Sequence, residues 1–359
     1  MPAASSERSV LMDDLALPSA TVITGAAGWL GRALVHHLGT DVGTYQRGGL
    51  IRALVLDQSE ADAVHAVSDR VETVIGSVTE PASLERLLHG LPCDTDVIHT
   101  AGVIHPAKVS DFFAINAAGA ANVAEAVHRG GMRRLVHVSS NSPFGTNPSD
   151  ADTFRANEPY NPYLGYGESK MQGELAVLAH VESGLNAVIV RPPWFYGPLQ
   201  PPRQTTFFRL VRRGKFPKFG DGNQRRSMVY VENLVQGIVR AELSPASTGR
   251  GYWVADARPY TVNEIIATVG RALTDEGYDV KKGAMALPVF AGRIAERADR
   301  LLQGAGRYQQ QLHVMGEMAH SIACDIDATE SELDYHPQIE LYEGMRRSIQ
   351  WCRAEGLEL

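Results

Sequence analysis

Short runs of β-branched and aliphatic residues alternate with longer helical stretches through the first half of the chain. The runs do not alternate strictly between apolar and polar positions, which indicates strands buried on both faces and paired in parallel. The predicted strands cover residues 20–24, 51–56, 71–75, 96–100, 135–139 and 187–191, and the predicted helices cover residues 28–38, 59–67, 81–88, 109–129 and 161–182. The pattern therefore predicts a doubly wound α/β sheet.

The pattern changes after residue 191, where prolines crowd the segment 192–202. A basic helix is then expected to end near residue 213, and the later elements are short strands mixed with helices. The predicted strands cover residues 228–231 and 251–254, and the predicted helices cover residues 262–273, 289–302 and 343–353. We therefore divide the chain into a disordered leader, a main domain and a smaller α+β lobe that mainly binds the substrate. Their bounds are 1–18, 19–191 and 192–359.

The composition argues against several classes of protein. The 359 residues include 34 Lys and Arg against 41 Asp and Glu, and a net charge of −7 argues against a nucleic-acid partner. No apolar run approaches the roughly 18 residues of a membrane helix, so no membrane partner is expected. Cys93, Cys324 and Cys352 lack metal-site spacing and cannot all pair. They indicate reduced thiols in a cytoplasmic protein without a metal site.

A glycine-rich loop follows the first predicted strand and opens the first predicted helix. Gly25 permits a tight turn, Gly28 lets the backbone approach a pyrophosphate, and Gly31 lets the helix pack on the strand. The phosphates of a dinucleotide would lie at the positive end of this helix. Asp57 ends the second strand, where a carboxylate accepts hydrogen bonds from the adenosine ribose and repels a 2′-phosphate. Together these features predict a Rossmann domain that prefers NAD to NADP.

Tyr166 and Lys170 lie one helical turn apart near the start of the last helix of the predicted main domain. A phenol is a poor base at its reference pKa of about 10, and a nearby ammonium with a positive nicotinamide favours the phenolate. Ser140, at the end of the fifth strand, is placed to polarise a substrate carbonyl or alcohol while Tyr166 moves its proton. Tyr278 and Lys282 repeat the spacing, but flanking glycines argue against a helix there.

These motifs resemble those of the extended short-chain dehydrogenases/reductases, in the NAD-dependent epimerase/dehydratase family, over about residues 20–355. The family patterns TGxxGxxG, NxxGxxN, YxxxK and RPxxxYGP and its C-terminal pattern all have counterparts in the chain. They fall, in that order, on residues 24–31, 116–122, 166–170, 191–198 and 333–351. The resemblance implies an NAD-dependent enzyme whose catalytic residues are Ser140, Tyr166 and Lys170.

The resemblance also implies a set of residues that bind NAD. They are Gly25, Ala27, Gly28, Trp29, Leu30, Gly31, Asp57, Ser77, Val78, Thr100, Ala101, Gly102, Asn116, Ser139, Tyr166, Lys170 and Pro193. Ser77 stands where the family usually has an acidic residue that contacts adenine, so the backbone at Val78 is expected to take over that contact. The resemblance further implies a homodimer through the helices at 109–129 and 161–182.

The expected substrate contacts point to a nucleotide-activated sugar. Arg226 follows the GDG sequence at the position where nucleotide-sugar enzymes bind a pyrophosphate, and Arg203 lies in a basic helix. Guanidinium groups offer paired donors to phosphate oxygens. Ser140, Asn141 and Trp194 complete the expected set, with Trp194 in the place of an asparagine that many such enzymes use.

We therefore expect a nucleotide-sugar 4-epimerase, in which Tyr166 removes a ring hydroxyl proton and Ser140 shares it. Asn141 and Ser142 replace the Asp-Glu pair of the related dehydratases, which argues against 4,6-dehydration. Two alternatives remain open. One is a 3β-hydroxysteroid-type or other alcohol dehydrogenase, whose apolar pocket would use Trp194, the phenylalanines that follow it and residues 287–291. The other is a non-catalytic protein that senses a dinucleotide.

Overall fold

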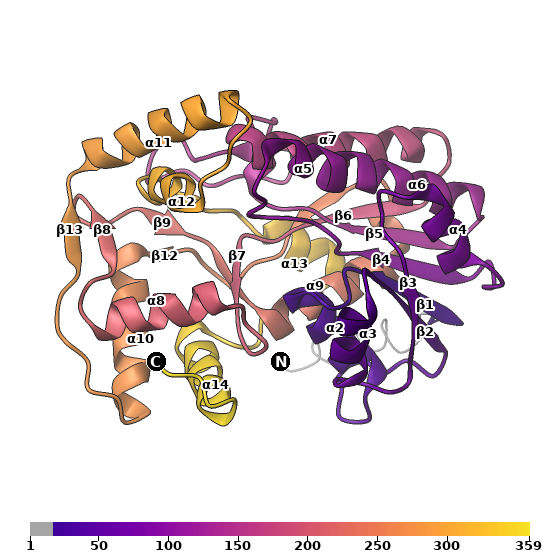
Figure 1. The fold of residues 1–359 in the computed structure, drawn as a ribbon, viewed down its shortest axis with the longest axis horizontal. Helices are drawn as coiled ribbons and strands as arrows, with labels where there is room; N and C mark the ends of the chain where they lie inside the picture. Colours follow the sequence, from indigo (N-terminus) through magenta and orange to yellow (C-terminus); the bar gives the residue numbers. More distant parts are fainter. Residues whose placement is uncertain (1–16) are drawn as a thin grey trace, which may run out of the picture.

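The computed structural model describes residues 17–359, and its main feature is a seven-stranded parallel sheet (Figure 1). The strand order is β11-β6-β5-β4-β1-β2-β3. The strands are β1 (Ala20–Thr24), β2 (Leu50–Val55), β3 (Val71–Ile75), β4 (Thr95–His99), β5 (Arg134–Val138), β6 (Ala187–Arg191) and β11 (Gly251–Trp253). The predicted doubly wound architecture is confirmed, and the first six strands lie within one residue of their expected bounds. Most of the proposed leader lies outside the described residues.

Helices cover both faces of this sheet (Figure 1). One face carries α4 (Pro81–Leu88), α6 (Gly119–Arg129) and α7 (Leu164–Glu182), and the other carries α2 (Trp29–Gly39), α3 (Gln58–His65) and α9 (Val231–Leu243). Neighbouring residues of one strand enter opposite cores: Val22 packs with the first set of helices and Ile23 with the second. Burial on both sides explains why the strands show no polar alternation.

The structure corrects the expected place of strand 251–254, which belongs to the central sheet and not to the C-terminal lobe. Its residues pair in parallel with β6. The helix before it, α9, was not predicted, and its Leu234, Val235 and Ile238 are fully buried. A helix that is apolar on nearly all sides must be covered by other elements. Helix α9 accordingly packs on one face of the sheet, and the chain after it adds β11 at the edge of the sheet.

The expected helix at 109–129 is also interrupted. It consists of α5 (Val109–Phe112), a π-helical turn η1 (Phe113–Ala118) and α6. The wider turn contains Asn116, whose side chain bonds to Val103 in the loop after β4. Single π-helical turns occur frequently at functional sites, and the pattern of apolar residues does not predict this one.

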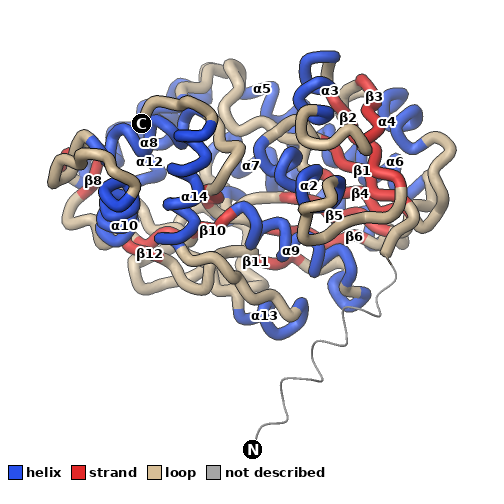
Figure 2. Tube along the Cα trace, turned by 90° about the horizontal axis from the view of Figure 1, so that it is seen from below, coloured by secondary structure: helices blue, strands red, loops and turns tan. Residues whose placement is uncertain are grey.

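The rest of the chain forms a lobe reached from the carboxyl end of β6. Figure 2 shows α8, α10, α12 and α14 grouped at one end of the molecule and the strands β1 to β3 at the other. The strand pairs of the lobe are β7 (Trp194–Tyr196) with β10 (Met228–Tyr230), β8 (Pro217–Phe219) with β13 (Met285–Leu287), and β9 (Arg225–Arg226) with β12 (Tyr260–Thr261). Its helices are α8 (Pro202–Arg212), α10 (Val262–Asp275), α11 (Val289–Gly304), α12 (Gln310–Met318) and α14 (Leu341–Ala354). Helix α13 (Asp327–Leu333) instead packs against α9 and β11 of the main domain, and the short turns are η2 (Ser142–Phe144) and η3 (Pro245–Ser247).

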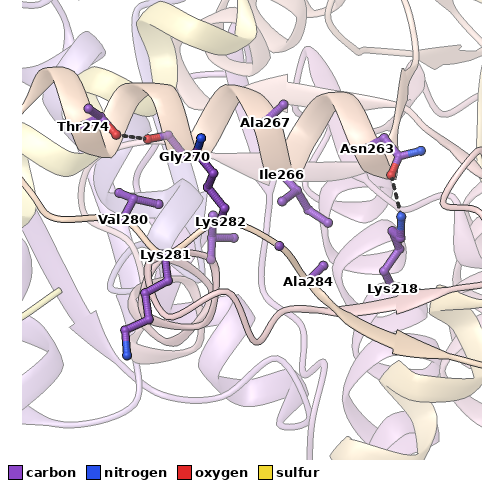
Figure 3. A pocket seen from close by; sticks show the side chains of 12 residues that line it. Lys218, Asn263, Ile266, Ala267, Gly270, Thr274, Val280, Lys281, Lys282 and Ala284 are labelled. Atoms are coloured by element: carbon purple, nitrogen blue, oxygen red, sulfur yellow. Dashed lines mark hydrogen bonds between the residues drawn. The ribbon is translucent and has the colours of Figure 1, made fainter.

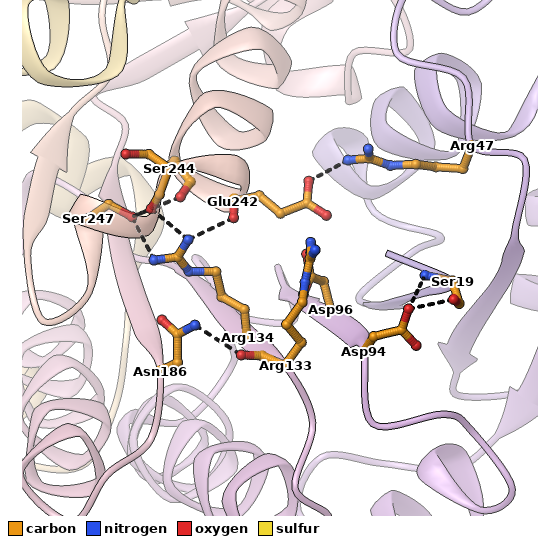
Figure 4. Close-up of polar contacts among 11 residues, drawn as sticks. Ser19, Arg47, Asp94, Asp96, Arg133, Arg134, Asn186, Glu242, Ser244 and Ser247 are labelled. Carbon is orange, nitrogen blue, oxygen red and sulfur yellow. Dashed lines mark hydrogen bonds and ion pairs between the residues drawn. The ribbon is translucent and has the colours of Figure 1, made fainter. Parts of the chain in front are cut away.

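At the amino ends of the strands, charged side chains bond to one another (Figure 4). Arg47 lies 2.5 Å from the Glu242 carboxylate, and both side chains are buried. Arg134 donates to the Glu242 carbonyl at 2.9 Å, and Arg133 donates to Asp96 at 2.7 Å. This network ties α9 to the sheet at the edge opposite the candidate site. No helix within residues 17–359 is long and apolar enough to cross a membrane.

Candidate active site

The glycine loop between β1 and α2 has the close contacts that its sequence predicts. Gly25 has a φ of +70°, and a Cβ at this residue would lie 2.7 Å from the backbone nitrogen of Ala101. A Cβ at Gly31 would lie 2.1 Å from the Gly25 carbonyl oxygen. Helix α2 begins at Trp29 without an acidic residue in its first turn. Its free N–H groups and positive end therefore suit an anion such as a diphosphate.

Hydrogen bonds fix the neighbouring loop after β4. The Thr100 hydroxyl donates to the Thr24 carbonyl at 2.7 Å, which ties the ends of β4 and β1 together. Asn116 accepts from the Val103 N–H at 2.8 Å and donates to the Val103 carbonyl at 2.9 Å. Its amide also donates to the Ser169 hydroxyl at 3.1 Å. One side chain thus holds the loop against helix α7, which carries the catalytic candidates.

Tyr166 and Ser140 meet at the carboxyl end of β5. Desolvation raises the pKa of the Tyr166 phenol, and a hydrogen bond with Ser140 and the charge of Arg203 act in the opposite direction. Lys170 is buried, and its ammonium donates to the Val138 carbonyl at 2.9 Å. Burial lowers the pKa of Lys170 to about 8. Ser140 and Arg203 thus favour the phenolate, and the predicted effect of Lys170 on Tyr166 stays a prediction.

Two stacked histidines lie under Lys170 and were not singled out from the sequence. His99 and His137 occupy paired positions of β4 and β5, with ring centroids 5.2 Å apart. Burial, followed by the charge of Lys170, lowers the pKa of His99 to about 3. Both rings are consequently neutral at physiological pH, and they add no charge beneath the ammonium.

Arg203 lies beside the catalytic candidates at the start of α8. Its guanidinium lies 6.0 Å from the centroid of the Trp29 ring, and it has no ion-pair partner within residues 17–359. The Trp29 indole donates to the Pro198 carbonyl at 2.6 Å and packs on Phe195 with a centroid distance of 4.5 Å. Trp29 therefore joins the glycine loop to the segment that carries Arg203.

A comparison with protein families shows which family has this arrangement of motifs. Residues 21–255, well over half of the chain, match the NAD dependent epimerase/dehydratase family. The chain belongs to this family. It is an NAD-dependent enzyme of the extended short-chain dehydrogenase/reductase type, as the motifs predicted.

Individual relatives agree with this family. The chain is 44% identical over 342 residues to the uncharacterized protein y4nL of Sinorhizobium fredii, covering 93% of this chain and 95% of that protein. It is 24% identical over 347 residues to the UDP-glucose 4-epimerase of Vibrio cholerae, covering 94% and 96%. A solved UDP-glucuronic acid 4-epimerase of Bacillus cereus in complex with NAD has a TM-score of 0.72 at 18% identity, over 94% of this chain and 99% of that one. At that identity the last likeness shows the fold.

The residues present fit the NAD of an epimerase/dehydratase family member. The Ser139 hydroxyl is buried at the end of β5 and has no hydrogen-bond partner within the described part of the chain. Such an orphaned group fits a ligand that supplies the partner. Asn122 donates to the Val78 carbonyl at 3.0 Å and so fixes the loop that contains Ser77. The remaining predicted contacts, Ala27, Leu30, Gly102 and Pro193, lie on the same strand-end loops or at the start of α2.

Asp57 has a structural task in addition to the predicted one. It is exposed at the end of β2, and its carboxylate accepts the Glu60 backbone N–H at 2.9 Å as the N-cap of α3. A cap of this kind leaves the second carboxylate oxygen available to a ribose. The contact with a ribose remains a prediction.

The three other substrate candidates, Arg226, Trp194 and Asn141, are held by protein contacts or buried. Arg226 donates to the Glu317 carbonyl at 2.6 Å, and Trp194 packs edge-on against Phe207 at 5.2 Å between centroids. Glu317 also raises the pKa of Tyr166, after desolvation, so Arg226 lies in the same neighbourhood as the phenol. Asn141 is buried beside Ser140. Their contacts with a substrate remain predictions.

The segment between α11 and α12 was not predicted to take part in the site, yet aromatic contacts link it to Tyr166. The Tyr308 hydroxyl lies 2.7 Å from Nδ1 of His105, and its ring packs edge-on against Phe112 at 5.1 Å. Phe112 in turn packs against Tyr166 at 5.7 Å. Tyr308, between α11 and α12, is thus linked to Tyr166 through two aromatic contacts. His105 and Tyr308 are 203 residues apart, and no local pattern links them.

A separate cavity of about 460 Å³ lies between α8, α10 and the segment before β13 (Figure 3). Lys218, Lys282 and Ile266 are among its lining residues, and Lys218 donates to Asn263 at 3.2 Å. None of the catalytic candidates lines it. The candidate active site is therefore defined by the loops at the carboxyl ends of β1, β4 and β5.

Proposed function

We propose that the chain is an NAD-dependent 4-epimerase of a nucleotide-activated sugar. The observation that carries the proposal is the cluster of Tyr166, Ser140 and Arg203. Both neighbours act to lower the pKa of the Tyr166 phenol, and Arg203, which has no ion-pair partner within residues 17–359, lies 6.0 Å from the ring of Trp29 beside the glycine loop. An acid-base phenol suits a ring hydroxyl, and an accessible guanidinium suits an anionic substrate. UDP-glucose 4-epimerases among the relatives support the same class of substrate.

Each catalytic candidate then has a defined task. NAD, when bound, accepts and returns a hydride. Tyr166 removes the proton of the sugar hydroxyl and later returns it, while the Ser140 hydroxyl holds the same oxygen. The buried Lys170 ammonium donates to the Val138 carbonyl and would hold the nicotinamide ribose. Because an epimerase restores its cofactor in each cycle, Tyr166 must act as base and then as acid.

The arginines would bind the diphosphate. Arg203 is exposed at the start of α8, and its charge acts on Tyr166. Arg226 already donates one bond to a backbone carbonyl, which leaves other donors of its five for phosphate oxygens. Asn141 and Trp194 would contact the sugar. In this proposal the nucleotide lies in the C-terminal lobe and the sugar lies over the sheet. Residues 19–191 would then bind mainly NAD and residues 192–359 mainly the substrate, although β11 belongs to the central sheet.

The alternative of a steroid-type alcohol dehydrogenase has less support in the described residues. Its pocket would need an apolar wall made of the phenylalanines of α8 and residues 287–291. Phe207 and Phe208 are buried in the core of the lobe, and Phe290 is 62% exposed on the outer surface. These side chains do not form one continuous wall.

The test is to incubate the purified enzyme with UDP-glucose, UDP-N-acetylglucosamine and UDP-glucuronic acid and to follow the C4 epimer by NMR. We expect one epimer to form without net production of NADH, and no product with Tyr166→Phe. Net NADH formation with a sterol or simple alcohol, and no epimer, would support the dehydrogenase alternative. Bound NAD with no turnover of any substrate would support the dinucleotide sensor.

Two further proposals follow from the same reasoning. Side by side, α6 and α7 expose an outer face that includes Leu175, and we expect a homodimer to form there. Sedimentation analysis of Leu175→Arg, which should yield monomers, tests this interface. The three cysteines are free thiols within the described residues, and we expect a reduced, cytoplasmic location.

A further inference from the structure

Helix α11 is turned with its small and polar residues inward and its large apolar residues outward. Gly292, Ala295 and Asp299 are buried against α12 and its surroundings. A Cβ at Gly292 would lie 2.4 Å from the Ala319 side chain, so the two segments pack too closely for larger residues. Figure 1 shows α11 along the outer edge of the lobe with α12 beneath it. A surface helix normally turns its large apolar residues toward the protein core and its polar residues toward water. Helix α11 shows the reverse.

The outer face of α11 consists of Val289, Phe290, Arg293, Ile294, Arg297 and Leu301. Phe290 is 62% exposed, Ile294 59% and Leu301 77%. These three residues follow the spacing of one helical stripe, since they are separated by four and seven positions. Large aliphatic and aromatic side chains that gather on one exposed face mark a surface that binds something apolar.

The charge of this face is uniformly positive. Arg293 and Arg297 are exposed and have no ion-pair partner within residues 17–359. Arg300 borders the face and pairs with Glu296, while the other acidic residue of the helix, Asp299, is buried against His313. No exposed carboxylate therefore lies on the outer face of α11, although the whole protein has a net charge of −7.

We propose that the outer face of α11 binds an anionic lipid surface and holds the enzyme on it. Phe290, Ile294 and Leu301 would enter the boundary between headgroups and acyl chains. Arg293 and Arg297 would keep their stems along the apolar layer and reach the lipid phosphates. A surface helix of this kind lies in the membrane plane, so it needs no spanning segment, and the proposal departs from the expectation of no membrane partner.

A second copy of the chain is a poorer occupant of this face. A twofold contact would place the same face of each copy against the other, and unpaired arginines would meet arginines. A lipid surface with negative headgroups satisfies both the apolar stripe and the charge. The inference does not depend on the identity of the sugar substrate. It does place Tyr308 and its partner His105 near the lipid, because Tyr308 lies just after α11.

The experiment is flotation of the full-length protein with vesicles of phosphatidylcholine alone or mixed with phosphatidylglycerol. We expect binding to the mixed vesicles that weakens as salt is added, and little binding to phosphatidylcholine. Arg293→Gln with Arg297→Gln should lower the partition coefficient roughly 30-fold, since each basic residue near such a surface contributes about 1 kcal/mol. Phe290→Ser with Leu301→Ser should lower it about 100-fold, from the apolar area lost.

Matched controls separate this face from general effects of exposed residues. Val42→Ser with Leu56→Ser removes apolar side chains that are 80% and 61% exposed elsewhere, and should bind like the wild type. Arg155→Gln with Arg213→Gln is the corresponding control for charge, because both arginines are exposed and have no ion-pair partner within residues 17–359. Equal binding to both kinds of vesicle, no binding at all, or equal losses in the controls would overturn the proposal. So would sedimentation analysis in which Phe290→Ser with Leu301→Ser dissociates an oligomer of the wild type.

Discussion

At the amino edge of the central sheet, arginines bond to carboxylates, whereas at the carboxyl edge Lys170 and Arg203 bond to none within the described residues. Arg47 and Glu242 form a buried pair at 2.5 Å, and Arg133 bonds to Asp96 (Figure 4). Lys170 donates only to a backbone carbonyl, and Arg203 lies over the ring of Trp29. The paired charges Arg47–Glu242 and Arg133–Asp96 thus lie at the amino edge. Helices α7 and α8 bring two cations without a carboxylate partner in the described part of the chain to the carboxyl edge, where Arg191 of β6 forms a buried pair with Glu174 at 2.7 Å.

This difference separates residues that hold the fold from residues that are available to ligands. A buried charge that is already paired gains nothing from a ligand, and its removal leaves its partner unpaired. A cation without a carboxylate partner retains its capacity to bind an anion. We therefore expect substitutions of Tyr166 and the unpaired cations at the carboxyl edge to change activity, and substitutions of the paired charges at the amino edge to change stability.

The largest effect is expected from Tyr166→Phe at the carboxyl edge. The substitution removes the acid-base hydroxyl and keeps the ring that packs on Phe112. Epimerase kcat should fall about 10³-fold, while the free energy of unfolding should change by less than about 1 kcal/mol. Initial rates and urea denaturation measure the two quantities. Activity within tenfold of the wild type would remove Tyr166 from its proposed role.

Arg47→Met should produce the opposite result at the amino edge. It leaves the buried Glu242 carboxyl without its cation, and loss of one partner of a buried pair lowers the free energy of unfolding by about 3 to 5 kcal/mol. The kcat of the folded enzyme should not change. The control is Arg47→Met with Glu242→Leu, which should recover most of the stability by removing both charges. A loss of activity at full stability would contradict the proposed division of the two edges.

The pH dependence of stability sharpens the role of Glu242. Burial raises the pKa of Glu242 above its ordinary value, and the charge of Arg47 acts in the opposite direction. Because the folded state then holds more of this proton than the unfolded state does, stability should fall as the pH rises above the ordinary pKa of a glutamate. The slope from this group is at most about 1.4 kcal/mol per pH unit. Urea denaturation of Glu242→Gln from pH 5 to 8 should show a flatter profile than the wild type.

The sequence allowed correct prediction of the parts that depend on local pattern. Six strands follow from continuous apolar runs, and the glycine loop follows from the need for small residues at Gly25 and Gly31. Both depend on neighbours within a few positions. The place of β11 depends on pairing with β6, some 60 residues earlier, and three residues are too short to specify a partner.

The contact of Tyr308 with the site and the outward orientation of the apolar residues of α11 could not be predicted from the sequence, for a similar reason. The contact between His105 and Tyr308 requires the fold of the whole lobe. The apolar residues of 287–291 suggested a buried wall, but the close contact of Gly292 with Ala319 turns the helix so that Phe290 faces outward. Arg203 was ambiguous because a basic helix face looks the same whether it meets water or a ligand.

The smallest expected effects concern Asp57, which both stabilises the fold and is predicted to contact the cofactor. Its carboxylate caps α3 through the Glu60 N–H, and it is predicted to favour NAD over NADP. Asp57→Ala should lower the free energy of unfolding by about 1 kcal/mol and also weaken the preference for NAD. Asp57→Ser keeps an oxygen that caps the helix, so stability should be retained while the preference for NAD still falls, because the charge is gone. Urea denaturation and the ratio of the two cofactors' dissociation constants measure these effects. If Asp57→Ser retains the full preference for NAD, the carboxylate acts on the helix alone, and the choice of cofactor must be attributed to other residues of the cleft.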